Sequence, residues 1–184
     1  KFKFVFAHHV TGGTHDYARG GVEGAAYNEW GGHDNPEINS DMPWTFNINR
    51  PTFEMPIHQM MVANGVTLFF HGHDHVFARE ALDGVVYVEV PHTANAGYGT
   101  GFDHYTDDGE DTRVINNSGH ILVSVTPDHV TFDYVRAFLP EDENSELCDL
   151  SNITGCHKNG ASYYTETIPA LASNSKPVAV TDTL

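Results

Sequence analysis

Histidines stand at the ends of two apolar segments in this sequence. The first segment spans residues 2–7 and the second spans residues 66–70, and both have the composition of buried strands. The histidines that follow them are His8, His9, His71, His73 and His75. In open α/β sheets, ligands bind at the carboxyl ends of the strands. The pattern therefore predicts a sheet that carries imidazoles along one edge.

The rest of the pattern predicts an α/β fold with a mixed sheet that is rich in strands after residue 66. Residues 54–64 have the apolar spacing of a helix, and Gly65 follows as a stop signal. The methionines of this segment are interpreted as core packing. Further strands are predicted over residues 76–80, 85–90, 121–126, 130–138 and 163–168.

Two long segments are predicted to be loops. Residues 12–52 contain many glycines and an aromatic cluster without a sustained period, which predicts an ordered loop that covers the site. Residues 103–119 are acidic and glycine-rich, which predicts a surface loop. The length of 184 residues suits one domain over residues 1–169, and residues 170–184 have the polarity of a linker toward a further domain.

Charge and hydropathy exclude some partners. The chain has 25 acidic and nine basic residues and a formal net charge of −16, which repels nucleic acid and anionic lipid at long range. The same field repels a phosphate substrate, so phosphate chemistry would require a local cation, most simply a bound metal. No window approaches the roughly 18 uninterrupted apolar residues of a membrane span. We therefore expect neither nucleic-acid binding nor a membrane span.

The two cysteines bear on the cellular compartment. Cys148 and Cys156 lie eight positions apart in a polar segment, which favours a small disulfide loop over free thiols. Such a bond persists in an oxidising environment, so the chain is expected to be extracellular, periplasmic or at the cell surface. The first residues already have the pattern of a buried strand, which favours a part of a longer protein.

The spacing of the second histidine group favours metal binding. His71, His73 and His75 occupy alternate positions in Phe-Phe-His-Gly-His-Asp-His, directly after an apolar strand. Neutral imidazoles in this position can converge on one cation, and Gly72 is expected to let the backbone turn. For His8, His73 and His75 the alternative is a core histidine whose hydrogen bonds are satisfied by the protein.

Two motifs resemble those of the calcineurin-like metallophosphoesterases, which include the purple acid phosphatases. That family ends one core strand with a ligand histidine and a later one with Gly-His-x-His. Phe4-Val-Phe-Ala-His8 and Gly72-His73-Asp74-His75 match these motifs in type, order and strand context. The resemblance extends over residues 2–138 by the order of elements, and it implies the C-terminal half of the family's α/β sandwich.

The resemblance also implies a site and a reaction. His8 and His73 correspond to ligands of one metal, and His75 corresponds to a ligand of a second metal. Two divalent or trivalent ions are implied, and the donors suit zinc, iron or manganese. The family hydrolyses phosphate esters through a metal-bridging hydroxide that attacks phosphorus in line.

The sequence departs from the family in one major respect. The motifs Asp-x-His, Gly-Asp-x-x-Asp and Gly-Asn-His-Asp/Glu are absent, because the chain starts after their place. They supply the bridging aspartate, an asparagine ligand and a histidine that acts as the general acid. We therefore expect that an N-terminal half of the same protein, or a companion chain, completes the site. The isolated chain is expected to be inactive.

Several other residues are weaker candidates for the site. His9 and His71 adjoin predicted ligands and could donate hydrogen bonds to them, but a plain structural role is the alternative for both. Asp74 could orient an imidazole. Arg19 could bind a phosphate oxygen, but a salt bridge with a nearby acid is the alternative. His15, His33 and His92 lie in predicted loops, where they could face the metals or be solvated.

A non-enzymatic function is the rival interpretation. A surface or assembly module could retain the fold and some ligands while serving adhesion, and the linker-like C-terminal residues are compatible with this role. Intact Asp-x-His and Gly-Asn-His-Asp/Glu motifs encoded upstream would favour the enzyme, and degenerate motifs would favour the module.

Overall fold

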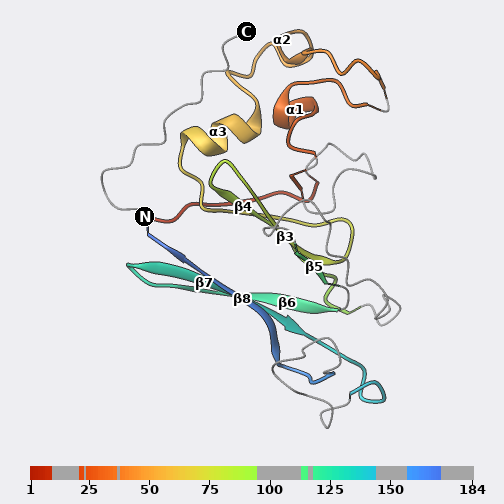
Figure 1. Cartoon of the computed structure of the whole chain (residues 1–184), viewed down its shortest axis with the longest axis vertical. Helices are drawn as coiled ribbons and strands as arrows, with labels where there is room; N and C mark the ends of the chain where they lie inside the picture. The colour runs from red at the N-terminus through yellow and green to blue at the C-terminus, as the bar shows by residue number, and fades with distance from the viewer. Residues whose placement is uncertain are drawn as a thin grey trace.

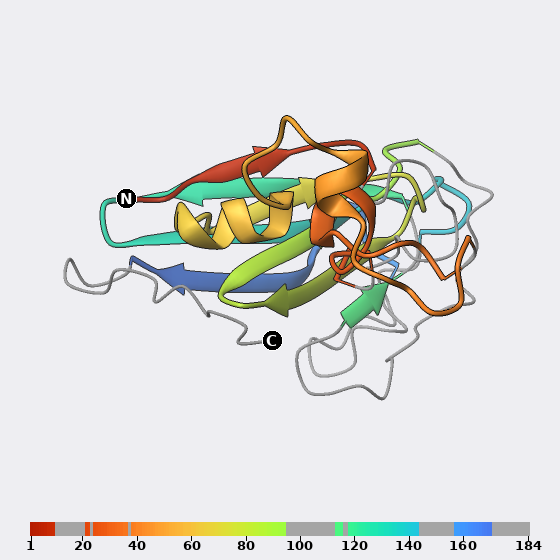
Figure 2. The ribbon, with the colours of Figure 1, turned by 90° about the horizontal axis from the view of Figure 1, so that it is seen from above.

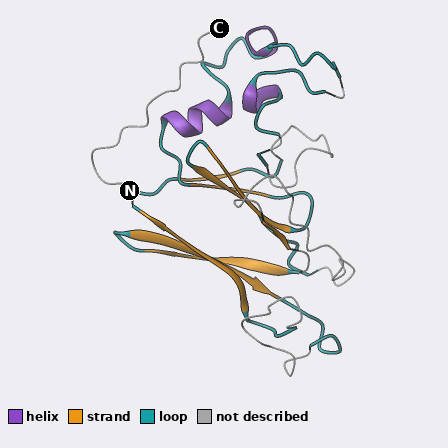
Figure 3. Cartoon of the chain, viewed as in Figure 1, coloured by secondary structure: helices purple, strands orange, loops and turns teal. Residues whose placement is uncertain are grey.

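The computed structural model describes residues 1–9, 21–22, 24–36, 38–94, 113–115, 118–143 and 157–170. These residues form two β-sheets and three short helices, arranged in three layers (Figure 1). The larger sheet lies in the middle, with the helices on one face and the smaller sheet on the other. Figure 3 shows the same layers by type of secondary structure.

The larger sheet is mixed and has five strands in the order β1-β2-β4-β3-β5. The strands are β1 (Phe4–Phe6), β2 (Leu68–His71), β3 (Phe77–Leu82), β4 (Val85–Glu89) and β5 (Arg113–Ile115). Strands β1, β2 and β4 run parallel, whereas β3 is antiparallel to both β4 and β5. The turn between β3 and β4 consists of Asp83 and Gly84, both with positive φ, as expected for an Asp-Gly hairpin.

The smaller sheet is an antiparallel meander of β6 (Gly119–Val125), β7 (His129–Arg136) and β8 (Ser162–Pro169). Every second residue of β7 is buried, as expected for a strand with one face on the core. The core between the two sheets is aromatic: Phe77 stacks on Tyr134 with ring centroids 4.6 Å apart. Arg79 of β3 also forms two hydrogen bonds, of 2.6 and 2.5 Å, with the carboxylate of Glu166 on β8.

The helices α1 (Asn28–Gly31) and α3 (Ile57–Ala63) cover the other face of the larger sheet, and α2 (Phe46–Asn49) lies against α1 (Figure 2). Trp30 and Met61 are buried there, and the Trp30 ring lies 4.9 Å from the ring of Phe69 on β2. The burial of Met61 agrees with the expectation of core packing, although the adjacent Met60 is 39% exposed. No helix in the described residues is long and apolar enough to span a membrane.

The mixed α/β content and the abundance of strands after residue 66 are confirmed, but two loop predictions are wrong in part. Residues 113–115 form β5 within the stretch predicted as a surface loop. The segment 12–52 contains α1 and α2, and its residues Ala25 and Trp30 belong to the core cluster between the helices and the larger sheet. A strand of three residues and helices of four are too short to show a period. Of the predicted linker, only Ala170 lies among the described residues.

Candidate metal centre

The carboxyl ends of the three parallel strands, β1, β2 and β4, lie side by side at one end of the larger sheet. The backbone N–H of Gly72 donates to the carbonyl of His8 at 3.0 Å, which joins the end of β1 to the end of β2. The N–H of Val90 donates to the carbonyl of His71 at 2.7 Å, which joins the end of β4 to β2. This register brings the histidines after β1 and β2 to the same place, as the sequence predicts.

Three of these histidines form a cluster that could hold a cation. One ring nitrogen from each of His8, His9 and His73 lies within 4.8 Å of the other two. The ring centroids of His9 and His73 are 4.1 Å apart, and those of His8 and His73 are 5.7 Å apart. Because zinc binds imidazole nitrogen at about 2.0–2.1 Å, small side-chain rotations would suffice for the three nitrogens to share one ion.

The turn that carries His73 and His75 has an unusual backbone. His73 has a backbone φ of +117° and His75 has a φ of +61°. Residues other than glycine rarely adopt such conformations. Such residues cost of order 1–3 kcal/mol each and cluster at functional sites. Gly72 is expected to provide the turn, but its φ is not positive. A Cβ on Gly72 would lie 3.7 Å from His8 Nδ1. The strain therefore falls on the candidate ligands themselves.

His75 lies beside His92, which follows β4. Their ring centroids are 4.9 Å apart and the rings are nearly perpendicular. Both side chains are half-buried. The three-histidine cluster does not include His75, so the structure places the predicted second-metal ligand with a different partner from His8 and His73.

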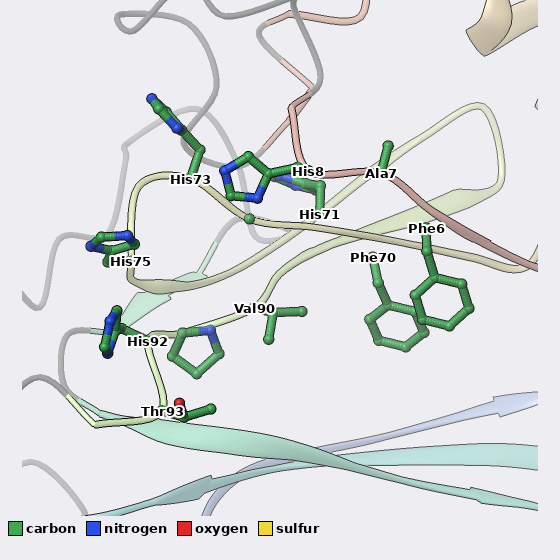
Figure 4. A pocket seen from close by; sticks show the side chains of 12 residues that line it. Phe6, Ala7, His8, Phe70, His71, His73, His75, Val90, His92 and Thr93 are labelled. Atoms are coloured by element: carbon green, nitrogen blue, oxygen red, sulfur yellow. The ribbon is translucent and has the colours of Figure 1, made fainter.

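One pocket of about 570 Å³ connects the two histidine groups (Figure 4). Its polar lining comes from Thr93 and from five histidines, His8, His71, His73, His75 and His92. Its apolar lining includes Phe6, Phe70 and Val90, with the first two rings stacked at 5.1 Å. The described residues of the segment 12–52 do not line this pocket, although Gly21 lies against His71. Residues 12–20 of the predicted covering loop lie outside the described residues, so this expectation stays a prediction.

A buried acid–base pair lies beneath the histidine-bearing turn. His71 Nδ1 is 2.6 Å from Glu89 Oε2, and both side chains are fully enclosed. Glu89 Oε1 accepts a hydrogen bond of 2.9 Å from the backbone N–H of Asp74. Burial raises the pKa of the Glu89 carboxyl, while the contact with His71 opposes this shift. Glu89 thus connects β4 to the turn between the two candidate ligands.

The cluster offers three imidazole donors to a cation. Imidazoles of the cluster are suitable ligands for zinc, iron or manganese. Asp74 Oδ2 is buried without a hydrogen-bond partner, which leaves one carboxylate oxygen in the turn available for a cation or a further donor. Within the described residues, however, no carboxylate belongs to the three-histidine cluster. Among the described residues, the cluster itself therefore contains no anionic ligand that could bridge two cations.

The predicted site residues have different positions in the structure. His8 and His73 lie together, and His9, predicted as a hydrogen-bond donor behind the ligands, lies with them. His71 is paired with Glu89, a residue that the sequence reasoning did not single out. A charged residue within the apolar run of residues 85–90 was the available signal for Glu89.

The remaining loop candidates separate in the same way. His33 makes an edge-to-face contact with Trp44 and does not line the pocket, whereas His92 does. Arg19 and His15 lie outside the described residues, as do Cys148 and Cys156.

No protein-family model matches the chain, and no curated protein matches it.

Proposed function

We propose that this chain is the histidine-bearing part of a dinuclear metal-dependent phosphoesterase that resembles the calcineurin-like family. The observation that carries the proposal is the cluster of His8, His9 and His73, formed by the ends of two adjacent parallel strands. The order of elements, from a histidine-ended strand through a helix to the Gly-His-Asp-His turn, supports the same family architecture. When bound, the metal ions would polarise the ester and lower the pKa of water.

The composition of the site supports the proposal of a partner. Two cations about 3.5–4 Å apart repel each other unless an anionic ligand bridges them, and neutral imidazoles do not provide one. We propose that the carboxylates come from an N-terminal half of the same protein or from a companion chain. The ligands His8 and His73 would bind one metal, and His75 would contribute to the other.

The edge of the sheet next to β1 offers a place for that partner. Among the described residues, β1 pairs only with β2, so its other edge is not used in this part of the chain. Phe6 on this strand is 71% exposed. An adjacent groove of about 560 Å³ is lined by the apolar side chains of Phe4, Phe6, Phe70, Ile121, Val123 and Val125. A partner that adds a strand to β1 would cover both the edge and this groove.

Zinc titration of single variants tests the metal site. His8→Ala, His9→Ala and His73→Ala should each lower zinc affinity by about tenfold or more, because each removes one of three donors. His129→Ala is the control, since this half-buried histidine of β7 contacts Thr126 and does not line the pocket. A zinc affinity that is the same in the His8, His9 and His73 variants as in wild type would refute the cluster as a metal site.

An activity assay tests the partner. The isolated chain with zinc, iron or manganese should not hydrolyse an aryl phosphate ester, and the continuous parent protein should hydrolyse it in a chelator-sensitive manner. Turnover by the isolated chain at the rate of the parent would contradict the proposal that carboxylates come from elsewhere. A parent protein with intact zinc binding and no turnover would favour the surface-module interpretation.

A further inference from the structure

We infer that His92 binds a non-bridging oxygen of the phosphoryl group as a hydrogen-bond donor and is not a metal ligand. This inference rests on the proposed phosphoesterase function and adds a substrate-binding residue to it. His92 follows β4, the third parallel strand whose end reaches the pocket, and its ring lies 4.9 Å from that of His75.

The hydrogen bonds of His92 determine its tautomer. The backbone N–H of Ala94 donates to His92 Nδ1 at 3.0 Å. A backbone N–H is only a donor, so Nδ1 must present its lone pair and the ring proton is on Nε2. A metal ligand requires a lone pair on the coordinating nitrogen, whereas Nε2–H is a donor suited to an anionic oxygen.

The backbone around His92 fixes the position of this donor. The carbonyl of His92 accepts a hydrogen bond of 3.1 Å from the N–H of Gly119, at the start of β6. The backbone N–H of Val90 donates a hydrogen bond to the carbonyl of His71 at the end of β2. His92 is therefore held between the two sheets, and a donor fixed in this way loses little conformational entropy when an anion binds.

The position of His92 also agrees with the charge of the ligand. The chain carries a formal net charge of −16, so a phosphoryl group needs local donors as well as cations. Among the described residues, the lining of this pocket contains five histidines and Thr93 on its polar side and no Asp or Glu. Within that part of the chain, a tetrahedral oxyanion in the pocket would meet His92 without a facing carboxylate from the lining.

Calorimetric titration with phenylphosphonate, a tetrahedral dianion that is not hydrolysed, tests this inference. The full chain is held at a zinc concentration that saturates it, and zinc affinity is measured separately for every variant. His92→Ala should lower phenylphosphonate affinity by about tenfold, the effect of one hydrogen bond to a charged group, and change zinc affinity less than twofold. His92→Gln, which retains an N–H donor near the position of Nε2, should recover most of the affinity.

His120→Ala is the matched control, because this exposed histidine adjoins Gly119 but lies outside the lining of the histidine pocket. It should leave both affinities unchanged. A tenfold loss of zinc affinity in His92→Ala would identify His92 as a ligand and overturn the inference. Unchanged phenylphosphonate affinity would also overturn it, while leaving the metal site intact. A wild-type chain that binds no zinc would remove the basis of both proposals, and the zinc titration alone reveals that result.

Discussion

His71 and Glu89 form a fully enclosed pair, with 2.6 Å between Nδ1 and Oε2, directly beneath the turn that carries His73 and His75. The other oxygen of Glu89 binds the backbone of Asp74 in that turn. Removing a carboxylate from water is costly, so an enclosed pair of this kind contributes more to the specific position of the turn than to net stability.

This pair predicts a pH dependence of stability. Burial raises the pKa of Glu89 above its ordinary value of 4.5, so the native state retains this proton to higher pH than the unfolded chain does. Stability from this group is present below pH 4.5 and is lost as the pH rises through the native pKa. His71 and Asp74 are the titratable groups next to it. Urea unfolding of the metal-free chain from pH 4 to 7 should show this decline, and Glu89→Gln should reduce it.

The control for this measurement is Glu141→Gln, which changes an exposed carboxylate. It should retain the wild-type slope. If Glu89→Gln had the same slope as wild type, Glu89 would not be the group responsible.

The hydrogen-bonded series Tyr87, His58 and Asp83 predicts a second stability effect. His58 Nδ1 lies 2.7 Å from the hydroxyl of Tyr87, and His58 Nε2 lies 3.0 Å from Asp83. Burial raises the pKa of Tyr87, and the nearby acids Asp83 and Glu80 raise it further, so the hydroxyl keeps its proton. Because Nε2–H of His58 donates to the Asp83 carboxylate, Nδ1 accepts a hydrogen bond from this hydroxyl. Tyr87→Phe leaves the buried nitrogen of His58 without this donor, which should lower the free energy of unfolding by about 1–3 kcal/mol.

Tyr164→Phe is a suitable comparison for that variant. The hydroxyl of Tyr164 donates to Glu166 at 2.7 Å, but Glu166 keeps its two bonds with Arg79 after the change. Its loss should be smaller, about 0.5–1.5 kcal/mol. Equal losses in chemical denaturation would argue against a special contribution from the buried histidine.

A substitution at Gly21 is predicted to have a steric effect, because this glycine lies against His71 and Tyr87. It has a φ of +95°, and a Cβ there would lie 2.7 Å from both His71 Nε2 and Tyr87 Cδ1. Gly84 has a similar φ of +83°, with nothing within 4 Å of its Cβ position. Gly84→Ala should therefore lower the free energy of unfolding by about 1–2 kcal/mol through backbone strain alone. Gly21→Ala should lower it further, and equal values would show that the loop yields without disturbing His71.

The cysteines give a prediction about the compartment. Cys148 and Cys156 should be bonded in protein isolated from an oxidising environment, because a short polar segment favours a small disulfide loop. Mass spectrometry without reductant should find neither cysteine alkylated. Two alkylated cysteines would contradict the bond and weaken the proposed extracellular, periplasmic or cell-surface location.

The sequence predicts the strands of this protein better than it predicts the partners of its histidines. Apolar alternation places β7 and β8 correctly because each has eight residues with one face on the core or partly covered. The position of His73 follows from its place after a buried strand. The sequence does not predict which imidazole lies next to His73. The orientation of its ring depends on the positive φ angles at His73 and His75, and the residue types do not indicate these angles. For the same reason His9 joins the cluster, while His75 lies beside His92.

The strand pairing described above also bears on the order of folding. Leu82 pairs with Val85 in one hairpin and Val125 with Val130 in another, so both hairpins close short loops. Phe4 pairs with Leu68, 64 positions later, and the entropy of closing that long loop must be overcome before β1 docks. We therefore expect the two hairpins to form early and β1 to join late. His8 and His9 come with β1, so the histidine cluster is completed only near the end of folding.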